Sequence, residues 1–508
     1  MFPSGHQWFL ERYPSDHRPV LVKFMGESEP LCGQFRITKL REELEEEEEE
    51  RYPWFTRIAE IKIELAIAYC DEEIFWRQKS REKWLREGDR NTKFFQASVK
   101  STRAKNSLQF LLDEHEREQF SNRDKSEVAV RYFSDLFKTS SPTSFTEIFS
   151  DFLPRVTDAM NAGLICDVTL EEVRLAVFSI ESEKTPGHDG MTGFFYKKYW
   201  EIVKHQLFED VRRFFRCGKI QDEWNHTYIT LIPKISTPRR MTDLRPISLC
   251  TVLYKILSKI LTSRLKKILP AIVSPMQSAF VSETLISDNI LIAHEIAHSL
   301  SSHREISESF MAITTDMSKA YDRVEWRFLR ELLVAMGFRT IWINWIMSCV
   351  QTVTYSVLIN GQPYGMIRPK RGLRQGDPLS PFLFVLCTEA LVHLLNRAES
   401  QARITGIQFH PSGPSINHML FADDSLFICQ ATNQQCQELF EVLSDYERVS
   451  GQKINASKSA ITFGSRVSAE IKAWIKAKSN ILTEGGTGKY LGLPEYLSGS
   501  TNNSLWGT

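Results

Sequence analysis

The sequence lacks the features that mark several classes of protein. Its nine cysteines include no Cys-x-x-Cys pair, which favours reduced thiols in a reducing compartment over a zinc or disulfide framework. Lys+Arg and Asp+Glu both total 63, so the net charge neither supports nor opposes a polyanionic partner. No internal repeat is present. With 508 residues, 42% of them hydrophobic, the chain has an ordinary globular composition and predicts about three or four structural units.

Convincing targeting and membrane-spanning segments are also lacking. The N-terminus has no basic region followed by an apolar stretch and a small-residue cleavage site, so we expect no signal peptide. The longest uncharged stretch, residues 340–367, contains Asn344 and Gln351 and ends in turn residues. It predicts a buried helix followed by a strand, and we expect a soluble chain with no membrane partner.

The balanced charge hides local segregation. Residues 42–50 carry eight glutamates in nine positions, which is typical of a solvated helix or linker. Residues 77–105 hold ten basic and three acidic groups, and residues 234–267 hold nine basic groups and one acidic group. Aromatic residues are interleaved with the first basic block, which suits contact with phosphates and stacking on bases. The same pattern also fits an amphipathic helix with its aromatics in a core and its cations in water.

Three motifs carry the residue types that catalysis needs. The first is a β-prone run that ends at Asp316 and is followed by Tyr321. The second is a Gly- and Pro-rich turn at residues 371–381 that opens a long apolar helix over 382–395. The third places Asp423 and Asp424 between two apolar runs, which predicts a tight β-hairpin with carboxylates at its tip.

Each motif has a simpler explanation when it stands alone. An aspartate after a strand is usually a turn former or a helix cap, and an Asp-Asp pair is also turn chemistry. Their order in one chain, after a basic block, favours a joint function. If the fold brings Asp316 beside Asp423, the carboxylates would hold two divalent ions for in-line phosphoryl displacement, and oxygen ligands favour Mg²⁺, with Mn²⁺ as an alternative.

The chain resembles the reverse transcriptase of LINE-type non-LTR retrotransposons, especially those of plants. The resemblance is carried by nine ordered segments: FWRQKSREKWLREGDRNTKFF (75–95), KTPGHDGMTGFFYKKYW (184–200), LIPK (231–234), DLRPISLCTVLYKILSKILTSRL (243–265), TTDMSKAYDRVEW (314–326), RGLRQGDPLSPFLF (371–384), FADD (421–424), SGQKINASKS (450–459) and YLGLP (490–494). It implies an α+β right-hand polymerase fold, with fingers and an antiparallel palm sheet flanked by helices.

The resemblance also implies a domain organisation. The N-terminus around Asp16 and His17 is similar to the closing motif of an endonuclease/exonuclease/phosphatase-like domain, too short here to form a nuclease. The expected parts are an endonuclease remnant (1–24), an acidic linker and basic helical extension (25–165), the start of the fingers (166–214), the fingers and palm (215–495) and a tail without a full thumb (496–508).

By resemblance, the motif residues acquire roles in RNA-directed DNA synthesis from dNTPs on an RNA template and a DNA primer. Asp316, Asp423 and Asp424 match the metal-binding carboxylates, Tyr321 the steric gate against ribonucleotides, and Lys458 a proton donor to pyrophosphate. Further positions match residues that contact the dNTP: Lys234, Arg245, Gln375 and Gly376. From the positive charge of the basic segments we also expect contacts with nucleic acid from Arg77, Lys79, Arg81, Lys83, Arg371 and Arg374.

Two departures from the family pattern leave an alternative open. His188 replaces a usual proline, and Glu283-Thr284 replaces a usual Gly-Arg, which exchanges a cation for an anion near the expected template path. The alternative, which the expected truncation at both ends and the lack of a full thumb favour, is an inactive retroelement remnant that binds nucleic acid without polymerising. By resemblance we expect the protein in the nucleus or cytoplasm.

Overall fold

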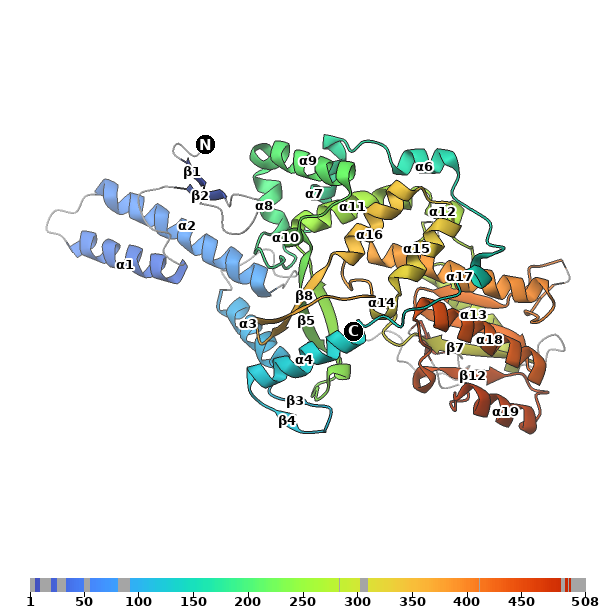
Figure 1. Ribbon diagram of the computed structural model, residues 1–508. Helices are drawn as coiled ribbons and strands as arrows, with labels where there is room; N and C mark the ends of the chain where they lie inside the picture. The colour runs from blue at the N-terminus through green and yellow to red at the C-terminus, as the bar shows by residue number, and fades with distance from the viewer. Residues whose placement is uncertain are drawn as a thin grey trace. The chain divides into compact units, whose positions relative to one another are not determined.

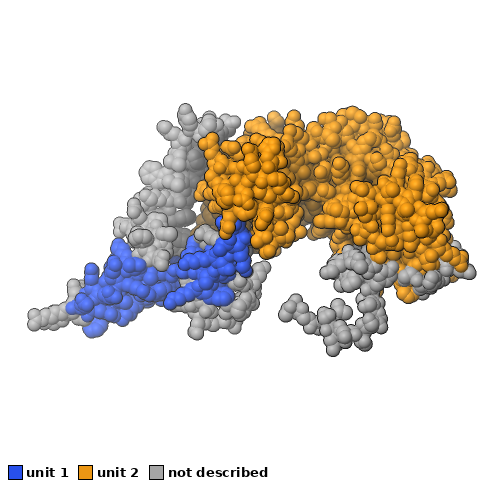
Figure 2. Space-filling model, turned by 90° about the horizontal axis from the view of Figure 1, so that it is seen from below, with its two compact units in different colours: residues 1–107 blue, residues 108–508 orange. Residues whose placement is uncertain are grey.

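The computed structural model divides the chain into two compact units, residues 1–107 and 108–508, which Figure 2 colours separately. It describes residues 5–9, 20–24, 33–49, 55–80, 92–282, 284–301, 309–410, 412–485, 489–491 and 493–494. Residues 108–165 are thus part of the larger unit. Both units together confirm a mixed α and β chain.

Helices dominate the described part of the smaller unit. The acidic run lies in α1, whose glutamates are mostly exposed, as expected for a solvated helix. On the other face, Ile37 and Leu40 pack with Ile61 and Ala68 of the following helix. The elements of this unit are β1 (Gly5–Phe9), β2 (Val20–Phe24), α1 (Gly33–Glu49), α2 (Phe55–Ser80) and α3 (Thr92–Asn106).

The larger unit contains two four-stranded sheets with helices packed around them (Figure 1). One sheet has the order β10-β11-β7-β12 and is antiparallel throughout. The other has the order β6-β5-β8-β9 and is mixed, because β5 and β8 run parallel. The strands are β5 (His226–Pro233), β6 (Leu244–Leu249), β7 (Phe310–Asp316), β8 (Thr354–Ile359), β9 (Gln362–Ile367), β10 (His418–Phe421), β11 (Asp424–Gln430) and β12 (Ala460–Phe463).

Helices before β7 pack against both sheets. Thr169 and Glu172 form a capping box at the start of α7. α4 packs on β8 and β9, and α13 packs on β7, β10 and β12. The elements are β3 (Leu111–Leu112), β4 (Glu118–Gln119), α4 (Asn122–Leu136), α5 (Thr146–Phe149), α6 (Asp158–Leu164), α7 (Leu170–Ser179), α8 (Gly193–Lys198), α9 (Trp200–Cys217), α10 (Asp222–Asn225), η1 (Met241–Asp243), α11 (Val252–Lys266), α12 (Leu269–Ile272) and α13 (Ile286–Ser301).

Helices after β7 form most of the remaining core. The uncharged stretch 340–367 folds into a buried helix, α16, followed by β8 and β9, as predicted. Of the described helices, α17 is long and apolar enough to span a membrane, but 78% of its apolar window is buried inside the protein. The elements are α14 (Ala320–Arg323), α15 (Trp326–Ala335), α16 (Thr340–Gln351), α17 (Ser380–Ser400), α18 (Asn433–Ser450), η2 (Ala456–Lys458), α19 (Ala469–Ser479), β13 (Lys489–Tyr490) and β14 (Leu493–Pro494).

Gly451 lets α18 end directly against the segment that follows β7. Its φ of +76° is left-handed, and its N–H donates to the carbonyl of Glu447. A Cβ atom at this position would lie 2.5 Å from the Arg323 carbonyl oxygen and 2.8 Å from Cγ of Glu325. The close approach requires glycine, and it sets where the chain enters residues 452–458.

We predict that Gly451→Ala destabilises the protein by roughly 2–4 kcal/mol, because left-handed strain and a backbone clash add together. The matched control is Gly218→Ala at the end of α9, where φ is +69° and the nearest atom to a Cβ is 3.8 Å away. It should cost only about 1 kcal/mol from backbone strain. Urea unfolding would compare the two variants, and equal costs would show that the close approach is unimportant.

Candidate active site

Three carboxylates meet at one end of the antiparallel sheet, where β7 ends and β11 begins, which we call the sheet edge. β7 ends at Asp316, which lies directly opposite Asp424 in the β7–β11 register. β10 and β11 form the predicted hairpin, with Phe421 opposite Asp424 and Asp423 in the turn between them. Two strands that are more than one hundred residues apart in sequence therefore bring these side chains together.

Burial and mutual repulsion raise the pKa of two of these carboxyl groups. Burial raises the pKa of Asp423, and the charge of Asp316 adds to the effect. Burial, followed by the charges of Asp423 and Asp316, raises the pKa of Asp424 to about 6. Lys458 and Arg245 oppose the shift at Asp423. Further positive charge at this edge would therefore favour the ionised carboxylates.

The segment after α18 supplies the nearest partners of Asp316. The Lys458 Nζ atom lies 3.3 Å from Asp316 Oδ2. Asn455 Nδ2 donates to the same oxygen over 3.3 Å, and the Asn455 backbone N–H donates to the Asp316 carbonyl over 2.8 Å. Lys458 was expected at the site, whereas Asn455 was missed because a backbone contact between distant segments leaves no signature in composition.

Positive side chains from the mixed sheet and from the start of α14 face the same region. Lys234 follows β5 directly, and its Nζ donates to the Thr242 carbonyl over 3.0 Å. Its pKa is lowered by burial first, and then by the charges of Lys319, Lys458 and Arg245. The charges of these three side chains therefore act on Lys234. Lys319 was not expected from the sequence.

Tyr321 presents its ring beside the carboxylates. It lies on α14 and stacks on Phe384 of α17 with ring centroids 5.0 Å apart and an interplanar angle of 19°. Burial, followed by the charge of Asp423, raises the pKa of Tyr321 to about 12. The phenol is therefore protonated at neutral pH, and the stacked ring occupies a fixed position close to Asp423.

The turn at residues 372–378 joins Tyr321 to the mixed sheet. The Leu373 N–H donates to the Tyr321 carbonyl over 2.7 Å, and the Ser248 N–H on β6 donates to the Gln375 carbonyl over 2.9 Å. The sequence predicted that this turn opens a long apolar helix, and α17 follows it. Gln375 and Gly376 thus lie on a segment that is bonded on one side to β6 and on the other to α14.

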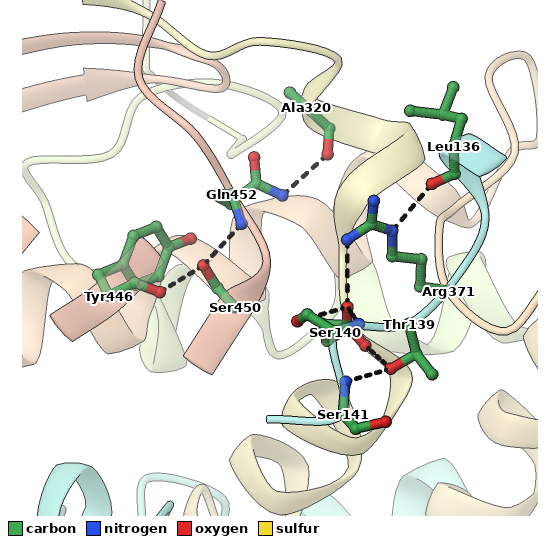
Figure 3. Close-up of polar contacts among 10 residues, drawn as sticks. Leu136, Thr139, Ser140, Ser141, Ala320, Arg371, Tyr446, Ser450 and Gln452 are labelled. Carbon is green, nitrogen blue, oxygen red and sulfur yellow. Dashed lines mark hydrogen bonds and ion pairs between the residues drawn. The ribbon is translucent and has the colours of Figure 1, made fainter. Parts of the chain in front are cut away.

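Arg371 forms an ion pair with the buried carboxylate of Glu325. Its Nε donates to the Leu136 carbonyl over 2.9 Å, and its Nη1 donates to Glu325 Oε1 over 3.3 Å. Glu325 also accepts hydrogen bonds from Thr139 and Ser140. Figure 3 shows Arg371, Thr139 and Ser140 converging on this network. Two of the Arg371 nitrogens, Nε and Nη1, are thus bonded within the protein, and its contact with nucleic acid stays a prediction.

Arg374 is a core residue, which corrects the expectation that it binds nucleic acid. It is 3% exposed, and its guanidinium carbon lies 3.6 Å from the centre of the Tyr254 ring. It donates to Asn225 Oδ1 over 2.5 Å and to the Cys349 carbonyl over 2.8 Å. The sequence showed a cation in a basic turn, but burial depends on the tertiary packing of α10, α11 and α16.

Several expected contacts fall outside the described residues. They include Arg81 and Lys83 of the basic block, Asp16 and His17 of the N-terminal motif, and Glu283 of the altered Gly-Arg pair. Arg77 and Lys79 belong to α2.

The donor set at the sheet edge fits a divalent cation that is completed by a substrate. Within the described part of the chain, no group of three His, Cys, Asp or Glu side chains is gathered closely enough to hold a metal by itself. Mg²⁺ in phosphoryl-transfer sites is commonly bound by one or two carboxylates together with substrate phosphates and water. Three adjacent carboxylates with two raised pKa values supply the protein's share of such a site.

Comparison with known families identifies the part of the chain that carries this edge. Residues 232–494, more than half of the chain, match the reverse transcriptase (RNA-dependent DNA polymerase) family. The matched range includes all three carboxylates, Lys234, Arg245, Tyr321 and Lys458.

The curated relatives come from mobile elements and from a plant mitochondrion. A transposon TX1 uncharacterized 149 kDa protein of Xenopus laevis is 27% identical over 389 residues, covering 75% of this chain and 29% of that protein. The Pol polyprotein of the R2DM element of Drosophila melanogaster is 28% identical over 336 residues, covering 65% of this chain and 29% of that protein. An uncharacterized mitochondrial protein of Arabidopsis thaliana is 59% identical over 68 residues, covering 13% of this chain and 56% of that protein.

We predict that Arg374→Met destabilises the protein by roughly 2–4 kcal/mol, because it leaves buried hydrogen-bond acceptors without a donor. RNA affinity per folded molecule should stay within about twofold, because Arg374 is enclosed by α10, α11 and α16. Arg368→Met makes the same exchange at an exposed position and serves as the control. Chemical unfolding and fluorescence anisotropy with labelled RNA measure the two quantities. A stable variant with weakened RNA binding would instead support a contact between Arg374 and nucleic acid.

Proposed function

This chain belongs to the reverse transcriptase (RNA-dependent DNA polymerase) family, and we propose that it extends a DNA primer with dNTPs on an RNA template. We further propose that it is the reverse transcriptase domain of a non-LTR retrotransposon polyprotein, of LINE type and plant origin. The named elements TX1 and R2DM among its relatives support a retrotransposon origin, and the relative from Arabidopsis thaliana supports a plant origin. The observation that carries the proposal is the placement of Asp316 opposite Asp424, with Asp423 in the adjoining turn.

The two sheets would then correspond to the parts of a right-handed polymerase. The antiparallel sheet β10-β11-β7-β12 would be the palm, because it carries the carboxylates at its edge. β5 and β6, which carry Lys234 and Arg245 near that edge, would belong to the fingers. An active site between palm and fingers would place the dNTP phosphates among these cations.

Asp316, Asp423 and Asp424 would hold the divalent ions, Mg²⁺ or Mn²⁺. When bound, two such ions would activate the primer 3′-hydroxyl and neutralise charge on the triphosphate. The protein's own acids would fix where the reacting phosphate sits. Attack of the 3′-oxygen on the α-phosphorus forms the new P–O bond as the bond to pyrophosphate breaks.

The cations would act on the triphosphate and on the leaving group. Lys234 and Arg245 would attract the negative charge of the triphosphate. Lys319 would join them, because its charge lowers the pKa of Lys234 and because the charge of Lys458, after burial, lowers the pKa of Lys319. Lys458, now paired with Asp316, would donate a proton from Nζ to the departing pyrophosphate. Outside this site, we propose that the basic segment 77–105 contacts template RNA.

The Tyr321 ring would select deoxynucleotides. The ring stacks on Phe384 and would exclude a 2′-hydroxyl from the adjoining sugar. Gln375 and Gly376, held between β6 and Tyr321, would support the base of the incoming nucleotide.

We predict that Asp423→Asn lowers primer extension on poly(rA)/oligo(dT) in Mg²⁺ by at least about a hundredfold, because it removes a metal ligand worth several kcal/mol. Duplex affinity should be unchanged, because no cation is lost. Asp135→Asn, an exposed aspartate on α4, serves as the control. Extension by the Asp423 variant above a tenth of the unmodified rate would contradict the assignment. An unmodified chain that binds the duplex without extending it would favour the inactive-remnant alternative.

We predict that Tyr321→Val raises the use of ribonucleotides relative to deoxynucleotides by at least about tenfold, since it opens space for the 2′-hydroxyl. Tyr321→Phe keeps the ring and should retain discrimination, which separates the ring from its hydroxyl. Single-nucleotide extension with rNTP and dNTP gives the two kcat/KM values. An unchanged ratio in a folded Tyr321→Val variant would overturn the steric-gate proposal.

A further inference from the structure

Residues 276–278, more than one hundred residues before the β10–β11 hairpin in sequence, are hydrogen-bonded to the outer side of β10. β10 is the edge strand of the antiparallel sheet, and residues 276–278 cover it. The Leu420 N–H donates to the Met276 carbonyl over 2.8 Å, and the Ser278 N–H donates to the Leu420 carbonyl over 3.2 Å. At Leu420 the edge strand β10 is therefore paired on both sides, with β11 and with residues 276–278.

The Gln277 side chain reaches from this segment into the hairpin turn. Gln277 is 0% exposed. Its Oε1 accepts from the Ala422 N–H over 3.1 Å and from the Ala279 N–H over 3.0 Å. Its Nε2 donates to Thr388 Oγ1 on α17 over 3.1 Å. The amide is thus fixed by α17 at one end and holds the turn at the other.

The backbone that Gln277 holds is strained. Ala422 has a φ of +54°, which is left-handed and costs a non-glycine residue about 1–2 kcal/mol. Ala422 directly precedes Asp423, so the orientation of its peptide determines where the Asp423 carboxylate lies. A strained residue persists only where the surroundings enforce it, and the Gln277 oxygen is the side-chain acceptor that the structure provides for its N–H.

Neighbouring side chains hold the segment itself. Asn289 on α13 donates from Nδ2 to the Leu420 carbonyl over 3.1 Å and accepts from the Ser278 hydroxyl. The Thr284 hydroxyl donates to the Ser278 carbonyl over 2.7 Å. Thr284, which stands at the position of the usual arginine, therefore bonds the residue that follows Gln277.

We propose that Gln277 is a positioning residue that keeps the Ala422 turn in the left-handed conformation and so sets the Asp423 carboxylate for divalent-metal binding. The inference deepens the proposed function and rests on it for its catalytic consequence. The effect of Gln277 on the conformation of the β10–β11 hairpin can be tested without catalytic turnover.

The test uses Gln277→Met, which preserves length and removes the acceptor for the Ala422 N–H. Its matched control is Asn161→Leu, since the buried amide of Asn161 likewise bonds backbone groups, those of Gly337 and Arg339. Thermal unfolding would establish that both variants fold. Hydrogen exchange of peptides spanning residues 419–425 and Mn²⁺ affinity by electron paramagnetic resonance need no catalysis, and kcat and KM for dNTP complete the set.

For Gln277→Met we expect the 419–425 peptides to exchange at least about tenfold faster, Mn²⁺ to bind several-fold more weakly, and kcat to fall about tenfold with KM for dNTP little changed. Asn161→Leu should lower the unfolding temperature without these effects. Adding Ala422→Gly should restore part of the Mn²⁺ affinity, because glycine adopts positive φ without the cost to alanine.

Unchanged exchange and unchanged Mn²⁺ affinity in folded Gln277→Met would overturn the proposal. So would equal effects of Asn161→Leu, because they would show general loss of stability. If the unmodified chain binds Mn²⁺ but does not extend primers, the proposed function fails, while exchange and Mn²⁺ binding still decide the role of Gln277.

Discussion

The site depends on one arrangement that is electrostatically unfavourable by itself: three carboxylates held at the same sheet edge. The pairing of β7 with β11 sets Asp316 opposite Asp424, and the hairpin turn adds Asp423. Their repulsion, together with burial, raises the pKa of Asp424 to about 6 and raises that of Asp423. Positive charge compensates this repulsion, and Lys458 and Arg245 oppose the rise in the pKa of Asp423.

The surrounding fold opposes this repulsion by fixing the backbone at each carboxylate. The segment after α18 bonds the Asp316 carbonyl through Asn455, and its path is set by the close approach of Gly451 to Arg323. Along the edge strand β10, residues 276–278 pair with Leu420, and the Gln277 side chain accepts a hydrogen bond from Ala422 in the β10–β11 turn. The acids are therefore placed by two segments that come from either side of them in sequence.

The local parts of this arrangement were predictable from sequence, whereas the long-range parts were not. A β-prone run ending at Asp316 and two apolar runs flanking Asp423 predicted a strand end and a hairpin, because such patterns depend on neighbouring residues. Arg374 was misread, because a cation in a turn looks the same in sequence whether it is buried or exposed. Gln277 and Lys319 gave no signal, since their importance comes from backbone and charges brought close by folding.

The most direct test of the central claim is a crystal structure of the chain with an RNA template, a dideoxy-terminated DNA primer, an incoming dNTP and Mg²⁺. The account predicts two ions bound between the Asp316 and Asp423 carboxylates and the nucleotide phosphates, with the sugar against the Tyr321 ring. A nucleotide bound elsewhere, or one bound at this edge without ions contacting Asp316 and Asp423, would contradict it.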